Sequence, residues 1–178
     1  MSVKSRNSEG GFVFRITHLA DAPRELVWDV FTKPEHLKHW WGPEGFMPSH
    51  CTVDLRPGGR FHYRLSGESG PDMWGKLEFL EIAPPERMVG IVSFSDPQGG
   101  ITVHPMNPDW PRRILSTTTF TEKGGKTEVT VTWVAYEPTE IERKTFEDGR
   151  NDMRAGFGGT FVQLDAYLAA LKEQGSQA

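Results

Sequence analysis

The side chains from which chemistry is expected first are six histidines and one cysteine. His36 and His39 share one face of a short predicted helix, but two neighbouring ligands without a third are weak evidence for zinc. His50 and Cys51 are adjacent on a predicted strand, so their side chains point to opposite faces of the sheet. We therefore predict no metal site.

His104 is the one catalytic candidate, and it is a weak one. A neutral imidazole here would orient a carbonyl or phenol or act as a base, although an ordinary loop histidine is the simpler interpretation. The sequence contains no phosphate-binding glycine loop, serine nucleophile elbow or paired-carboxylate motif. We predict no confident catalytic residue and no cofactor.

Aromatic side chains are numerous for a chain of 178 residues, with 11 Phe, 6 Trp and 3 Tyr. Rings of this kind fill protein cores, and they also line pockets for apolar ligands. The side chains that we predict to line such a pocket are Trp41, Phe46, Phe61, Tyr63, Trp74, Phe94, Trp110, Met153, Phe157 and Phe161.

A long C-terminal helix must position the last of these side chains. Apolar residues recur there at helical spacing, which predicts one continuous buried stripe: Met153, Phe157, Phe161, Leu164 and Leu168. Three glycines interrupt the same helix, and each costs about 1 kcal/mol relative to alanine. Gly156, Gly158 and Gly159 therefore serve either close packing of the helix on a sheet or room for a ligand.

Strands are predicted by alternation of apolar and polar residues, over 12–17, 50–55, 60–66, 73–82, 88–94, 114–121 and 127–135. Consecutive hairpins without helices between them indicate an antiparallel sheet. His62 alternates with Phe61 and Tyr63 and is predicted to face solvent.

Capping-box spacing indicates where two of the short helices begin. Thr32 and Glu35 predict a second short helix soon after the first, which ends at about Thr32. Thr139 and Glu142 predict another, running to about residue 148. The fold class is therefore α+β, with two short helices after the first strand. A curved antiparallel sheet of about seven strands wraps around the last helix in a helix-grip arrangement, with a cavity expected between them.

The segment 95–111 interrupts this regular pattern, with four prolines and two glycines in 17 residues. Irregular loops of this length are uncommon in compact domains, and most of them are lids, binding loops or disordered segments. We interpret the segment as a lid or a fixed rim of the pocket.

Composition excludes several classes of function. The net charge of −4 and the scattered Lys and Arg residues argue against nucleic-acid and membrane binding. One cysteine and a polar N-terminus without a signal-peptide pattern predict a cytoplasmic protein. We expect one domain over 12–172, with flexible tails at 1–11 and 173–178.

Several motifs together resemble one family. They lie at 27–37, 40–43, 54–59, 74–87 and 156–168. They are similar to the SRPBCC superfamily, in the branch that resembles the C-terminal domain of the activator of the heat-shock-protein-90 ATPase. The resemblance implies a helix-grip fold and an elongated pocket for hydrophobic or aromatic molecules. Members include ligand carriers, cyclase-type enzymes and chaperone cofactors, so the fold does not fix the function.

Three functions follow as hypotheses. The first is a carrier, sequestration or stress-related protein that binds a hydrophobic or aromatic small molecule. The second is a cyclase, dehydratase or hydrolase in which His104, Tyr63 or Arg64 assists. The third is regulation of a chaperone ATPase. The sequence does not choose between a monomer and a homodimer.

Overall fold

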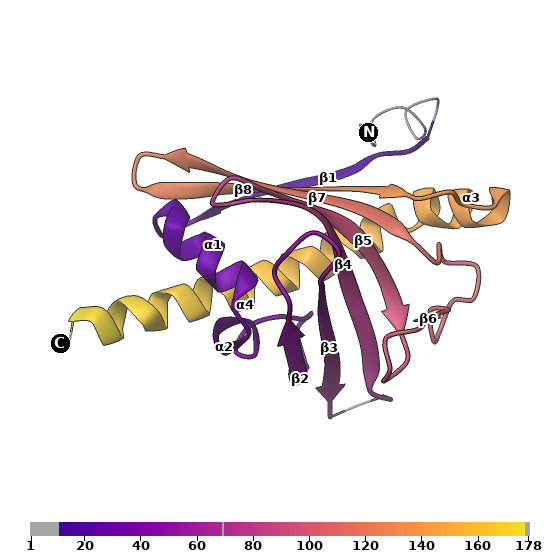
Figure 1. Ribbon diagram of the computed structural model, residues 1–178, viewed down its shortest axis with the longest axis horizontal. Coiled ribbons are helices and arrows are strands. Elements are labelled where there is room, and N and C mark those ends of the chain that lie inside the picture. The colour runs from indigo at the N-terminus through magenta and orange to yellow at the C-terminus, as the bar shows by residue number, and fades with distance from the viewer. Residues whose placement is uncertain (1–10, 69, 177–178) are drawn as a thin grey trace.

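The computed structural model describes residues 11–68 and 70–176. The N-terminal tail predicted over 1–11 therefore lies, apart from residue 11, outside the described residues. The described chain forms the predicted α+β domain, in which one curled antiparallel sheet holds a long helix across its inner face (Figure 1).

The sheet has seven long strands in the order β1-β8-β7-β5-β4-β3-β2, and each pairs with its neighbours in antiparallel fashion. This confirms the predicted antiparallel sheet. A two-residue strand, β6, pairs with the end of β5. The strands are β1 (Phe14–Ala20), β2 (Phe46–Val53), β3 (Arg60–Gly67), β4 (Met73–Ala83), β5 (Arg87–Ser95), β6 (Ile101–Thr102), β7 (Ile114–Lys123) and β8 (Lys126–Ala135).

Four helices accompany the sheet in the described residues. Two short ones, α1 (Arg24–Thr32) and α2 (Pro34–Leu37), follow β1 as predicted. Next to the last helix lies α3 (Glu140–Asp148), and α4 (Arg150–Ser176) runs for 27 residues across the inner side of the sheet (Figure 1). Of the tail predicted over 173–178, the described residues continue α4 to Ser176, and the last two lie outside the described residues.

The two predicted capping boxes have different outcomes. At α3 the box is confirmed, since the Thr139 hydroxyl accepts from the Glu142 backbone N–H at 3.2 Å and the Glu142 carboxylate accepts from the Thr139 N–H. At α2 the prediction is wrong. Pro34 occupies the first helical position and holds the preceding Lys33 extended, so Lys33 becomes the N-cap. Thr32 instead ends α1, where its hydroxyl donates to the Trp28 carbonyl at 2.7 Å.

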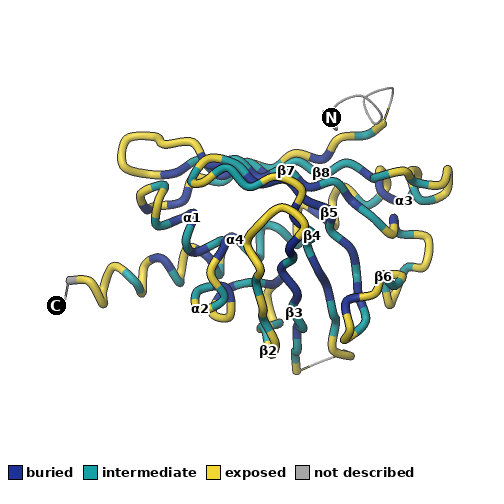
Figure 2. Tube along the Cα trace, in the orientation of Figure 1, coloured by how far each residue is buried: buried dark blue, intermediate teal, exposed yellow. Residues whose placement is uncertain are grey.

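The apolar stripe of α4 is confirmed as the side of the helix that faces the sheet. Phe161, Leu164 and Leu168 are buried in one core cluster with inward-facing residues of β7 and β8. Met153 is buried in a second cluster at the other end of the helix. In Figure 2, buried residues recur along the strands and helices, while the connecting turns are mostly exposed. Burial of this stripe against the sheet holds α4 in place.

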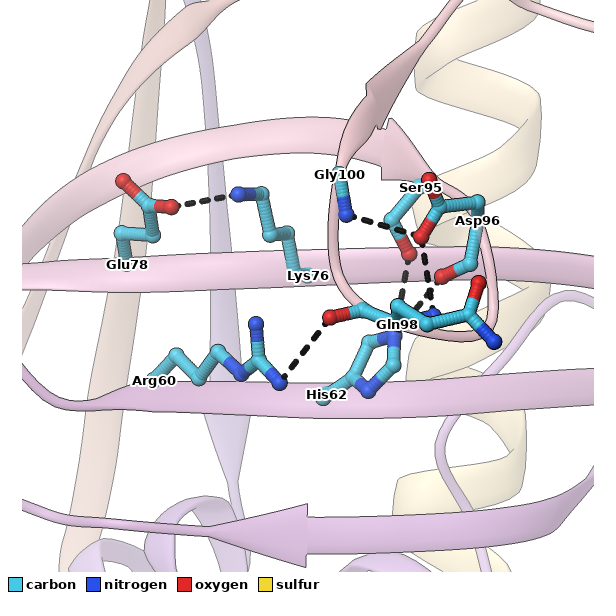
Figure 3. A network of polar contacts seen from close by, with 8 residues as sticks. All are labelled: Arg60, His62, Lys76, Glu78, Ser95, Asp96, Gln98 and Gly100. Atoms are coloured by element: carbon cyan, nitrogen blue, oxygen red, sulfur yellow. Dashed lines mark hydrogen bonds and ion pairs between the residues drawn. The ribbon is translucent and has the colours of Figure 1, made fainter.

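On the outer face of the sheet, the prediction that His62 faces solvent is wrong. Its side chain is only 3% exposed, because the segment that follows β5 folds back over β3 (Figure 3). The His62 Nε2 lies 3.1 Å from the Ser95 hydroxyl and 3.3 Å from the Asp96 carbonyl oxygen. The Asp96 carboxylate in turn accepts from the backbone N–H groups of Gln98 and Gly100, both at 2.8 Å, which fixes the turn.

Burial of His62 has a consequence for charge. Removal from water lowers the pKa of His62 below its usual value, and the hydrogen bond to the Asp96 carbonyl offsets only part of this effect. The positive charges of Arg60, His50 and Lys76 lower the pKa further. A histidine of this kind stays neutral in the folded protein at a pH where the unfolded chain binds a proton.

The free energy of unfolding is therefore expected to fall as the pH falls below about 6.5, the usual histidine value. Urea unfolding from about pH 7.5 to about pH 5.5 measures this slope. Burial lowers the pKa of His104 as well and adds a contribution of the same sign. The control is His62→Gln, which retains a nitrogen donor and cannot be protonated. Its slope should be shallower than that of the parent, and equal slopes would contradict the prediction.

Candidate functional site

A cavity of about 340 Å³ lies between the concave face of the sheet and α4. Its walls come from β3, β4, β5, β7 and β8, from α1 and α4, and from the segment 40–43 that follows α2. Most of the lining side chains are apolar or aromatic. Seven of the ten side chains predicted to line a pocket lie around it: Trp41, Phe61, Tyr63, Phe94, Met153, Phe157 and Phe161.

The other three predicted residues, Phe46, Trp74 and Trp110, are not part of this lining. A Cβ added at Gly75 would meet the Tyr63 ring, so position 75 faces the concave side. Successive residues of a strand face opposite sides, so the indole of Trp74 lies on the outer face. There its ring centroid is 5.0 Å from that of His62. Phe46 is the first residue of the edge strand β2. Alternation identifies residues that share a face, and it does not identify which face becomes concave.

Trp110 anchors the end of the 95–111 segment to the helices. Its ring centroid is 5.6 Å from that of Phe146 on α3, and a Cβ added at Gly149 would lie 2.8 Å from the indole. Gly149 therefore permits a close approach of the indole to the junction of α3 and α4. The other end of the segment is tied to the sheet by the pairing of β6 with β5.

His104, the weak catalytic candidate, does not line the cavity. Its Nδ1 accepts a hydrogen bond from the Met106 backbone N–H at 3.0 Å, and its ring centroid is 4.6 Å from that of Phe94. Phe94 does line the cavity, so the imidazole supports the wall from behind. Burial lowers the pKa of His104, which keeps the ring neutral at neutral pH.

Sequence reasoning missed several lining residues, among them Ser116, Thr118 and Trp133. The signal for them was present. Ser116 and Thr118 alternate with outward residues and share the inner face with Phe120, and Trp133 shares a face with Val131. Ser116 and Thr118 have small polar side chains, so only their alternation with Phe120 indicates that they face inward.

Tyr63 is the polar aromatic side chain of the cavity wall. Its ring lies over Gly75, where an added Cβ would be 2.5 Å from the Tyr63 hydroxyl. The ring can therefore lie flat on β4 only because that position is glycine. Burial raises the pKa of Tyr63 to about 12, so the phenol keeps its proton at neutral pH. The Trp41 indole packs edge-on against the Tyr63 ring, with ring centroids 5.8 Å apart.

A second indole and hydroxyl pair lies on β7 and β8. The Trp133 Nε1–H donates to the Ser116 hydroxyl oxygen at 3.0 Å, and both residues line the cavity. Lys76 also borders the cavity, but it pairs with His62, so its side chain lies on the outer face, where the ammonium group forms an ion pair with Glu78 (Figure 3). No Asp or Glu side chain is part of the lining among the residues that the structure describes.

The glycines of α4 combine both predicted roles at different positions. A Cβ added at Gly159 would lie 3.3 Å from the Glu44 backbone nitrogen, so this glycine allows close packing. Gln163 also holds α4 against the segment after α2, because its side-chain amide donates a hydrogen bond to the Gly42 carbonyl. Gly156 lines the cavity, and a Cβ added there would have nothing within 4 Å. Gly156 therefore leaves room inside the cavity.

Two further features of the described residues concern metal ligands and membrane-spanning helices. Across 11–68 and 70–176, no three His, Cys, Asp or Glu side chains come together as a set of metal ligands. In the same ranges, no helix combines the length and the apolar character needed to span a bilayer.

Comparison with known proteins gives one family and several solved structures. The family described as activator of Hsp90 ATPase homolog 1-like protein matches residues 21–169. A protein from Nitrosomonas europaea has a TM-score of 0.71 and 24% identity, over 93% of this chain and 99% of that chain. A protein from Mycobacterium smegmatis has a TM-score of 0.69 and 26% identity, over 92% of this chain and 94% of that chain. None of the curated proteins matches.

Proposed function

This chain belongs to the family of activator of Hsp90 ATPase homolog 1-like proteins, and from that premise we propose that it binds an uncharged, largely apolar small molecule in the cavity beneath α4. The family has the SRPBCC-type fold, which is a fold of ligand-binding domains. The observation that carries the proposal is the cavity of about 340 Å³ with its mostly apolar and aromatic lining.

The size and lining of the cavity support binding at useful affinity. A cavity of about 150 Å³ binds one benzene ring, so this one is sized for about two rings. A ligand that buries about 200 Å² of apolar surface gains roughly 5 kcal/mol from that burial, which offsets the entropy cost of association. Hydrogen bonds to the lining and a larger buried area would add to this gain.

The charge of the lining favours neutral ligands over anions. The ammonium group of Lys76 lies on the outer face with Glu78, so the ionisable side chain of the lining is Tyr63, which is neutral at neutral pH. An anion in the cavity would lose its hydration without a free cation to replace it. The enzyme hypothesis is less well supported, because neither His104 nor Arg64 lines the cavity.

A panel of ligands tests the proposal. Neutral alkylbenzenes, aromatic ketones, phenols and fatty alcohols are compared with fatty-acid carboxylates in thermal unfolding. At 100 times its dissociation constant, a ligand stabilises the fold by about 2.7 kcal/mol. For a domain of this size that raises the melting temperature by roughly 5 to 11 °C. The proposal fails if no neutral compound shifts the melting temperature and native mass spectrometry of protein purified from cells shows no bound molecule.

A further inference from the structure

We propose that the cavity selects ligands that carry a carbonyl oxygen, and that this oxygen accepts a hydrogen bond from the Ser116 hydroxyl. The inference rests on the ligand-binding function proposed above and specifies the chemical class of the ligand. Its basis is the direction of the hydrogen bond between Trp133 and Ser116.

Ser116 is only 7% exposed and lies on the concave face of β7, opposite Trp133 on β8. The Trp133 Nε1–H lies 3.0 Å from the Ser116 oxygen. An indole nitrogen is a donor only, so the serine oxygen must be the acceptor in this bond. The hydroxyl hydrogen of Ser116 has no other hydrogen-bond partner among the residues that the structure describes. It is therefore available to a ligand.

The space beside Ser116 supports the same conclusion. Its partner on the other neighbouring strand is Gly90, and the side chain that lies over Gly90 is that of Leu77, which is apolar and offers the hydroxyl no hydrogen-bond partner. Of the two neighbouring residues on the inner face of β7, Ile114 is apolar and Thr118 adds a second uncharged hydroxyl to the lining. A hydroxyl donor thus lies within an otherwise mostly apolar wall.

The hydrogen-bonding capacity of the lining favours an acceptor on the ligand over a donor. The Thr160 hydroxyl donates to the Gly156 carbonyl at 3.0 Å, within its own helix. The Tyr63 phenol, which keeps its proton at neutral pH, is a further O–H donor in the lining. A hydrocarbon would bury the Ser116 donor without a partner, which is costly, whereas a carbonyl oxygen would satisfy it.

Two probes of nearly equal shape test this selection. Benzophenone and diphenylmethane each have two phenyl rings, joined by C=O in the first and CH₂ in the second. Calorimetry gives both dissociation constants, and the selectivity is the diphenylmethane constant divided by the benzophenone constant. This ratio cancels changes in cavity shape, which affect the two probes together. A hydrogen bond from Tyr63 would strengthen benzophenone binding alone, but Tyr63 is present in every variant, so its contribution cancels when the ratios of two variants are compared.

The decisive comparison is between Trp133→Phe and the double variant Trp133→Phe, Ser116→Ala. The first removes the indole, which could otherwise replace the serine as a donor, and the pair then differs by one hydroxyl. The selectivity is expected to be about tenfold lower in the double variant, as for one buried hydrogen bond. An unchanged selectivity, with both probes still bound, would overturn the inference and leave the proposed function standing. Failure of both probes to bind the parent protein would count against both.

A measurement on the unaltered protein covers the case in which these variants do not fold. Isotope-edited infrared difference spectra, with ¹²C=O and ¹³C=O benzophenone, isolate the carbonyl stretch of the bound probe. A hydrogen bond from Ser116 should move this band to lower wavenumber than in cyclohexane. A band at the cyclohexane position would overturn the inference.

Discussion

Replacement of Gly156 by leucine is expected to fill the cavity and to weaken ligand binding by about tenfold or more, without unfolding the protein. Gly156 lines the cavity, and a Cβ added there meets no other atom within 4 Å. The leucine side chain would therefore enter the space that the ligand needs. Removal of a helix glycine also raises the helix propensity by roughly 0.5–1 kcal/mol, so the folded state should be at least as stable as in the parent.

Gly158→Leu is the matched control for this result. Two residues along a helix correspond to a rotation of about 200°, so position 158 lies on the side of α4 opposite to position 156. A Cβ at Gly158 also has nothing within 4 Å, and Gly158 is not part of the cavity lining. This variant gains the same helix propensity and should bind ligand as the parent does. Equal binding by both variants would show that the ligand lies elsewhere.

Leu164→Ala is expected to lower the free energy of unfolding by about 2–5 kcal/mol, more than any other substitution proposed for this protein. Leu164 is fully buried in the stripe of α4 that faces the sheet. Its truncation removes buried methyl groups and leaves a space that the surrounding strands fill only in part. Urea unfolding at neutral pH measures the change.

The comparison variant is Val162→Ala on the same helix, where the valine is 67% exposed. Its unfolding free energy should stay within about 0.5 kcal/mol of the parent value, because the side chain loses little contact. If the two variants were equally stable, the packing of α4 against the sheet would not be what holds the fold. Ligand binding gives a second measurement for this variant: Val162→Ala should have the same ligand affinity as the parent protein.

Much of the fold could be predicted because the relevant signals are local. The period of 3.6 residues placed Phe161, Leu164 and Leu168 on one side of a long helix, and the structure buries that side. The capping box at Thr139 involves residues three positions apart, so sequence is enough to specify it. The same spacing failed at Thr32, where the neighbouring Pro34 decided the helix start.

For the site as well, the features that depend on local sequence could be predicted, and those that depend on distant contacts could not. Alternation correctly grouped Phe61 with Tyr63 on one side of β3, and the grouping follows from the strand geometry alone. It did not tell which face of β4 would be concave, and Trp74 lies on the outer one. The burial of His62 was equally out of reach, because the segment that covers it is about 33 residues away in the chain.

Sequence by itself thus determined the elements, their order and the residues that share a face. Each of these depends on neighbours within a few positions along the chain. The tertiary structure alone decided that Gly156 opens onto a cavity while Gly159 packs against the segment after α2. It also decided that Ser116 meets an indole on the next strand. Contacts between distant segments depend on how the sheet curls around α4, and no local pattern encodes that curvature.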